Sequence, residues 1–141
     1  MPTAGNIAKI NGITFGGTVF AASGGTESTY SSGGTNYKAH MFTASGTFVV
    51  SSGSKAVDLL AVAGGGAGGN GMGGGGGGGG LIHTLGATPI TAGAGSYAIV
   101  IGSGAAGTTS NVTVNGTNTT GFSLTAIGGG GGSSLQMQRN S

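Results

Sequence analysis

The hydrophobic residues of this chain come in short clusters separated by Gly, Asn and Ser. The last cluster has the clearest pattern, because Phe122, Leu124 and Ala126 alternate with Ser123 and Thr125 and so place one face of a strand inward and the other in water. The other clusters are also rich in β-branched and aromatic side chains and are bounded by turn residues. The pattern predicts strands at Ile13 to Phe20, Thr47 to Ser51, Tyr97 to Ile101, Asn111 to Val114, and Phe122 to Ile127.

Glycine leaves little room for helices, since each interior glycine costs a helix roughly 1 kcal/mol relative to Ala. The longest windows without glycine are Thr35 to Ser45 and Ser54 to Ala63. The stretch Lys55 to Ala63 fits a helix or a buried strand by pattern, and we expect a central strand. Short strands separated by turn signals predict an all-β fold, a small antiparallel β-sandwich or barrel.

Two Asn-Gly pairs predict hairpins. Asn115-Gly116 lies between Thr-rich runs, and Asn-Gly is the strongest short-range hairpin signal because both central residues of a type I′ turn take φ > 0. Asn11-Gly12 lies between Ile10 and Ile13 and predicts a second hairpin near the N-terminus.

The composition changes sharply between Gly64 and Gly80, where 14 of 17 residues are glycine. Ordering eight consecutive glycines costs on the order of 8 to 16 kcal/mol of backbone entropy. The run is therefore either a flexible surface loop or a segment ordered by backbone hydrogen bonds to its neighbours. An extended helix with three residues per turn makes no internal hydrogen bonds and allows the second arrangement. The run comprises Gly73, Gly74, Gly75, Gly76, Gly77, Gly78, Gly79 and Gly80, and we expect it to be a glycine packing segment if it is ordered.

Charge and cysteine content narrow the function. The 141 residues include four Lys or Arg, two Asp or Glu and no Cys. An acid/base active site and a basic nucleic-acid surface are hard to build from so few charges, and no disulfide framework is available. We also expect no signal peptide and no membrane insertion.

Candidate chemistry is sparse. A hydrophobic strand followed by Gly64, Gly66 and Gly69 matches the dinucleotide fingerprint, but a helix must begin at the third glycine and the sequence there is nearly all glycine. A His-based catalytic site would need His40 or His83, with Asp58 to orient one of them, and no serine lies in a nucleophile motif. We therefore expect no enzyme activity, no catalytic residues, no cofactor and no metal. The possible surface-contact residues are Tyr30, Tyr37, His40, His83 and Tyr97.

Three stretches together carry a family resemblance. They are Tyr37 to Val50, Val57 to Gly69 and Ala94 to Gly104, in which strand motifs alternate in a fixed order with glycine runs. This order resembles the glycine-rich domain of tail-fibre and other virion proteins of tailed bacteriophages, over roughly Tyr37 to Gly132. The resemblance implies an all-β, non-enzymatic and commonly trimeric virion component, with glycine segments packed together and sometimes used to recognise a host surface.

The resemblance and the composition suggest three parts and a function. Residues 1–35 are expected to form an attachment arm or hairpin, residues 36–132 the glycine-rich β domain, and residues 133–141 a C-terminal tail. The expected role is a tail fibre or tail-tip component that contributes to host attachment. The alternatives are a capsid decoration protein and a carbohydrate-binding module. The expected partners are further copies of the chain, with a trimer favoured, other virion proteins, and a bacterial receptor or glycan, but not nucleic acid. The expected location is the virion, assembled in the host cytoplasm.

Overall fold

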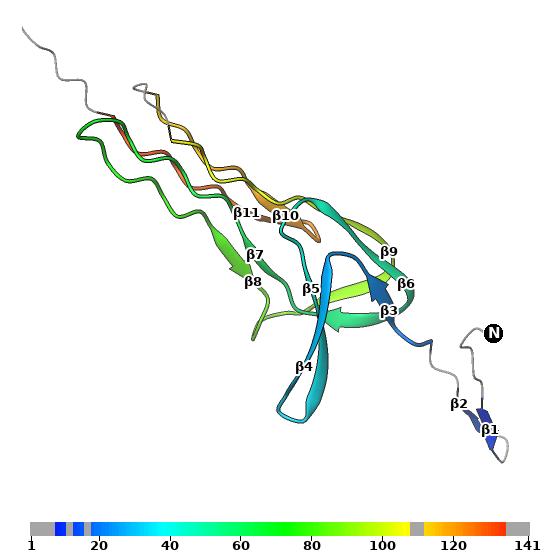
Figure 1. The fold of residues 1–141 in the computed structure, drawn as a ribbon. Coiled ribbons are helices and arrows are strands. Elements are labelled where there is room, and N and C mark those ends of the chain that lie inside the picture. Colours follow the sequence, from blue (N-terminus) through cyan, green and yellow to red (C-terminus); the bar gives the residue numbers. More distant parts are fainter. Residues whose placement is uncertain (1–7, 11–12, 16–17, 108–111, 135–141) are drawn as a thin grey trace, which may run out of the picture.

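The computed structural model describes residues 8–10, 13–15, 18–107 and 112–134, and every regular element among them is a β-strand (Figure 1). The strands form small separate antiparallel sheets that do not close into a barrel. The expectation of an all-β fold is thus confirmed, and the barrel alternative is wrong.

The largest sheet has the order β3-β6-β9. Its strands are β3 (Ala21–Ser23), β6 (Gly46–Val57) and β9 (Ile90–Ile99). Strand β6 contains the predicted strand Thr47 to Ser51, whereas β9 begins before Tyr97. The apolar face of this sheet buries Phe48, Val50, Ala92 and Ile99, which form the core of a region that we call the β body.

A two-stranded hairpin projects from the β body (Figure 1). It consists of β4 (Thr26–Ser32) and β5 (Thr35–Met41), paired over seven positions. Gly33 and Gly34 form its turn, with φ of 56° and 77°, which glycine adopts without a steric penalty. The expected division after residue 35 falls inside this hairpin.

The N-terminal hairpin pairs β1 (Ala8–Ile10) with β2 (Ile13–Phe15). Ile10 lies opposite Ile13, as the prediction of a hairpin at this point requires. Asn11 and Gly12 themselves lie outside the described residues, as do residues 16 and 17 of the predicted strand Ile13 to Phe20. Residues 18–20 are described and are not strand.

The expected central strand from Lys55 to Ala63 is interrupted. Strand β6 ends at Val57, and β7 (Leu60–Val62) begins a separate two-stranded sheet with β8 (Leu81–His83). Between them, the side-chain oxygen of Thr84 accepts a hydrogen bond from the Leu59 amide at 2.8 Å. This tertiary contact from a residue 25 positions away holds the chain at the bend, which no local pattern encodes.

The last hairpin pairs β10 (Thr119–Gly121) with β11 (Leu124–Ala126). Its turn residues are Phe122 and Ser123, with φ of 51° and 62°. Positive φ is rare for a bulky residue such as Phe. Phe122 is held there by its ring, which stacks on Tyr97 with centroids 4.5 Å apart. The predicted strand Phe122 to Ile127 therefore includes a turn, although its inward and outward alternation holds at Thr125 and Ala126.

Beyond the sheets, extended segments run side by side as a bundle (Figure 1). A central segment, 63–69, is surrounded by 73–80, 100–107, 112–118 and 127–134. Amides of Ala63, Gly66 and Gly69 donate to the carbonyls of 73–80, whereas those of Gly64 and Ala67 donate to 112–118. Donors to one neighbour thus recur every three residues, which is the period of the extended three-residue helix.

The ordered alternative for the glycine run is therefore the correct one. Gly74, Gly77 and Gly80 donate to the carbonyls of Ser133, Gly130 and Ile127 at 2.8, 2.8 and 2.6 Å. The same three glycines accept hydrogen bonds from the central segment. Backbone groups on both sides are satisfied in this way, which offsets the entropy that glycine loses on ordering.

The predicted hairpin at Asn115-Gly116 is absent. Gly116 has no positive φ and donates its amide to the Gly129 carbonyl at 2.8 Å, inside the bundle. The Asn115 side-chain oxygen accepts a hydrogen bond from the Gly131 amide, also at 2.8 Å. Lateral bonds to 127–134 keep the Asn-Gly pair extended and override its local preference for a turn. Residues 112–114 of the predicted strand Asn111 to Val114 belong to the same extended segment, and Asn111 lies outside the described residues.

Candidate functional site

The glycine bundle is so closely packed that many of its glycines leave no room for a side chain. A Cβ atom on Gly64 would lie 1.9 Å from the Ser103 carbonyl oxygen, and one on Gly66 would lie 2.1 Å from that of Gly130. Such distances are far inside van der Waals contact, so these backbones approach one another only because the side chain is hydrogen. Gly64, Gly66 and Gly69 are the glycines of the apparent dinucleotide fingerprint, and close packing explains all three.

Two asparagines replace backbone groups as hydrogen-bond partners in the bundle. The side-chain oxygens of Asn115 and Asn118 accept from the amides of Gly131 and Gly128, each at 2.8 Å. The two asparagines are three residues apart, so they point to the same neighbour of a three-residue helix. Sequence reasoning missed this role, although the spacing of the asparagines within a glycine-rich context was the available signal.

The β4–β5 hairpin presents two different faces. Register places Thr26, Ser28, Tyr30, Ser32, Thr35, Tyr37, Ala39 and Met41 on one face, which we call the Tyr face. The rings of Tyr30 and Tyr37 stack there with centroids 5.1 Å apart and an interplanar angle of 13°. Both residues are exposed, at 55% and 42% of their full accessible surface.

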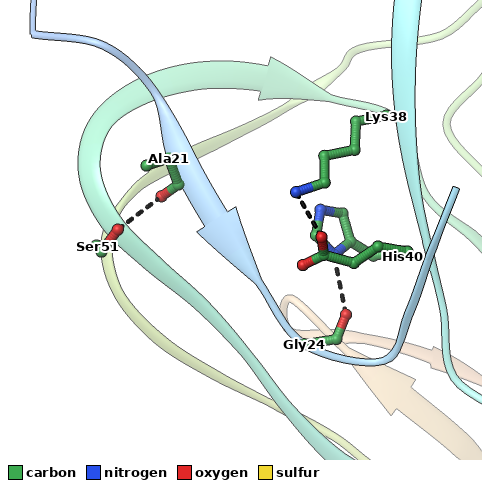
Figure 2. A network of polar contacts seen from close by, with 6 residues as sticks. Ala21, Gly24, Lys38, His40 and Ser51 are labelled. Carbon is green, nitrogen blue, oxygen red and sulfur yellow. Dashed lines mark hydrogen bonds and ion pairs between the residues drawn. The ribbon is translucent and has the colours of Figure 1, made fainter. Parts of the chain in front are cut away.

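The opposite face carries the hairpin's charges. Lys38 and Glu27 form an ion pair at 2.6 Å, and the hydrogen bond from Lys38 holds the pKa of Glu27 below its ordinary value of 4.5. The His40 ring hydrogen-bonds through Nδ1 to the Gly24 carbonyl at 2.9 Å (Figure 2). It also packs edge-on against Phe48, with ring centroids 5.0 Å apart. His40 therefore anchors the hairpin to the β body.

The remaining expected contact residues lie elsewhere. Tyr97 is half-buried in the β body, and its hydroxyl is hydrogen-bonded to the amide and the carbonyl of Gly93, at 3.0 and 2.9 Å. His83 is exposed on β8, opposite Leu60. The structure thus brings Tyr30 and Tyr37 together but separates them from Tyr97 and His83.

The described residues include two carboxylates, those of Glu27 and Asp58. Glu27 is paired with Lys38, and Asp58 accepts a hydrogen bond from the Thr84 hydroxyl at 3.4 Å, so the two carboxylates have different partners. No three His, Asp or Glu side chains gather within the described residues. A hollow of about 260 Å³ opens beside the hairpin base, lined by short side chains and backbone together with Met41 and Phe42. Ligand pockets for small molecules are usually larger, from about 300 Å³ upward. No membrane-spanning helix occurs among the described residues.

Comparison with known proteins supplies the family. Searches of curated proteins and of solved structures gave no match. A family model described as "Glycine-rich domain" matches residues 42–141, which begin just after the hairpin and include the whole bundle. Because this match covers well over half of the 141 residues, the chain belongs to the glycine-rich domain family.

Proposed function

We propose that this protein is a non-enzymatic structural component of a tailed bacteriophage virion. Its role is that of a tail fibre or tail-tip protein that contributes to attachment at the host surface. The proposal includes a homo-oligomer that contacts other virion proteins and a bacterial receptor or glycan. Assembly takes place in the host cytoplasm.

One observation carries the proposal, namely the glycine bundle. Its segments are held by backbone hydrogen bonds of 2.6 to 3.0 Å, and its tight glycines exclude side chains from the contacts between segments. Such a bundle provides a stiff extended support without reactive groups. That property suits a part that positions a contact surface at a distance from a particle, and the family's glycine-rich character agrees with it.

The elongated bundle favours the tail over the capsid. The bundle as a whole extends to one side of the sheets (Figure 1). A capsid decoration protein needs a broad contact with the shell, whereas a long narrow bundle offers its end as the most distant point. The bend at residues 70–72, in the green part of the ribbon, lies towards that far end (Figure 1), and Met72 is 63% exposed.

Counting the protein in purified particles tests the proposal. Quantitative mass spectrometry against the major capsid protein should find a low copy number, as a tail component requires. A copy number close to that of the capsid protein would instead indicate a decoration protein. Absence from the particles would overturn the virion assignment.

Competition for adsorption tests the attachment role. The purified protein should slow adsorption of the phage to its host, and a Gly66→Val variant, which places a side chain against the Gly130 carbonyl, should lose this effect. Gly107→Val is the matched control, because a Cβ at Gly107 meets nothing within 4 Å. Equal inhibition by wild type and Gly66→Val would show that adsorption does not depend on the bundle.

A further inference from the structure

The Tyr face of the β4–β5 hairpin is apolar at its centre, and no element of the described part of the chain covers it. Tyr30, Tyr37 and Met41 are 55%, 42% and 59% exposed. The hairpin is a sheet of its own with only two strands, and an isolated two-stranded hairpin is marginally stable in water. His40 fixes the base of the hairpin against Phe48 and Gly24. His40 lies on the opposite face, so these contacts do not bury the Tyr face.

The composition of the Tyr face is that of a protein interface. Aromatic residues and Met are enriched in the centres of such interfaces, and charged residues are depleted. The Tyr face has stacked tyrosines and a methionine, a border of Ser and Thr, and no charge. The formal charges of the hairpin, Glu27 and Lys38, both lie on the other face and neutralise each other. An uncharged partner surface is therefore the one that fits.

A second copy of this chain offers such a surface. Ser28 and Ala39 lie opposite each other between the tyrosine pair and Met41, and both side chains are small. A two-fold axis through this point brings the small residues of two hairpins together and places Met41 of each copy over the tyrosine rings of the other. Sulfur and aromatic rings make favourable contacts, and a two-fold contact requires a self-complementary surface of this kind.

We propose that two copies of the chain associate through their Tyr faces, antiparallel, about a two-fold axis between Ser28 and Ala39. Two residues of this face, Thr26 and Met41, also line the hollow at the base of the hairpin. This inference deepens the homo-oligomer of the proposed function, and it replaces the trimer expected from the resemblance with a dimer. It does not depend on where the protein lies in a particle.

Matched lysine substitutions on the two faces test the proposal. Ser28→Lys puts a charge at the centre of the Tyr face, whereas Ser31→Lys puts the same charge on the opposite face, beside Asn36. Both positions are exposed in the single chain, so both variants should fold. Sedimentation equilibrium should give twice the chain mass of 13.0 kDa for wild type and Ser31→Lys, and the single mass for Ser28→Lys.

A second variant tests whether the dimer is lost because the interface is disrupted rather than because the hairpin unfolds. Met41→Ala leaves the tyrosine stack and the charged face intact but removes the side chain that covers the partner's rings, and it should raise the dimer dissociation constant at least tenfold. Circular dichroism should match wild type for each variant. A monomeric or trimeric wild type, or a dimer that Ser28→Lys leaves intact, would overturn the proposal. A monomer whose Tyr30 and Tyr37 signals shift when host glycan is added would instead make the Tyr face a sugar-binding surface.

Discussion

The β body and the glycine bundle are two solutions to the same problem of ordering a chain with few large side chains. The β body buries Phe48, Val50 and Ile99, and its rings pack together at centroid distances from 4.5 to 6.3 Å. In the bundle, the buried apolar side chains of the described residues are those of Ala63 and Ala67, and backbone hydrogen bonds that recur every three residues hold the segments together. Side chains therefore order one region, and their absence permits the other.

The difference predicts opposite sensitivities to substitution. Removing atoms should harm the β body, where apolar contacts provide the stability. Adding atoms should harm the bundle, where carbonyl oxygens occupy the positions of the missing side chains.

The largest effect is expected from Phe48→Ala in the β body. Phe48 is 7% exposed and contacts the rings of His40, Tyr97 and Phe122. Its loss removes apolar burial and leaves a cavity, at a cost of about 3 to 5 kcal/mol. Chemical denaturation followed by near-ultraviolet circular dichroism measures this change. A loss below about 1 kcal/mol would mean that the aromatic cluster is not what orders this region.

The next effect is expected from Gly66→Ala in the bundle. A methyl group placed 2.1 Å from the Gly130 oxygen forces the two segments apart, which should cost about 1 to 3 kcal/mol or more. Hydrogen exchange should show lost protection at the amides of Gly74, Gly77 and Gly80, while β6 and β9 keep theirs. Gly130→Ala is the matched control, since a Cβ at Gly130 meets nothing within 4 Å. Equal effects of the two variants would contradict close packing as the reason for glycine.

A smaller effect of opposite sign is expected from Ser123→Gly. Ser123 is exposed and has φ of 62° in the turn between β10 and β11. Glycine adopts this conformation without the penalty that other residues incur, so the variant should gain up to about 1 kcal/mol. The melting temperature should therefore rise. A decrease would show that the Ser123 side chain stabilises the turn.

The smallest effect is expected from the exposed ion pair at the hairpin. Lys38 lowers the pKa of Glu27, so the stability that this carboxylate provides is present above its ordinary pKa of 4.5 and is lost as the pH falls through its lower folded value. The difference in melting temperature between wild type and Glu27→Gln should therefore be larger at about pH 6 than at about pH 3, and small at both. A difference that grows on acidification would contradict the sign of this pKa shift.

The sequence predicted the fold class better than the elements. Short β-branched clusters between turn residues indicated an all-β chain, and Thr47 to Ser51 lies within β6 as expected. The turn at Phe122 and Ser123 was not predictable, because neither residue favours positive φ and the stacking of Phe122 on Tyr97 holds the conformation. The hairpin predicted at Asn115-Gly116 was wrong for the converse reason, since hydrogen bonds to Gly131 and Gly129 hold this strong turn former extended.

For the expected contact residues too, the sequence named candidates and the tertiary structure decided which of them lie together. Isolated tyrosines in strands are ambiguous between surface and core, and only the register of β4 and β5 stacks Tyr30 on Tyr37. Tyr97 packs inward instead, because its hydroxyl is hydrogen-bonded to the amide and the carbonyl of Gly93.

By itself, the sequence determined that the chain is rich in strands, poor in charge and interrupted by glycine runs, because these properties follow from residue type and local spacing. It also restricted the run from Gly73 to Gly80 to two states, a loop or an extended segment with lateral hydrogen bonds. Only the tertiary structure decided between them. A glycine segment carries no side chain that specifies a neighbour, so its order depends on the carbonyls and amides that distant parts of the chain place beside it.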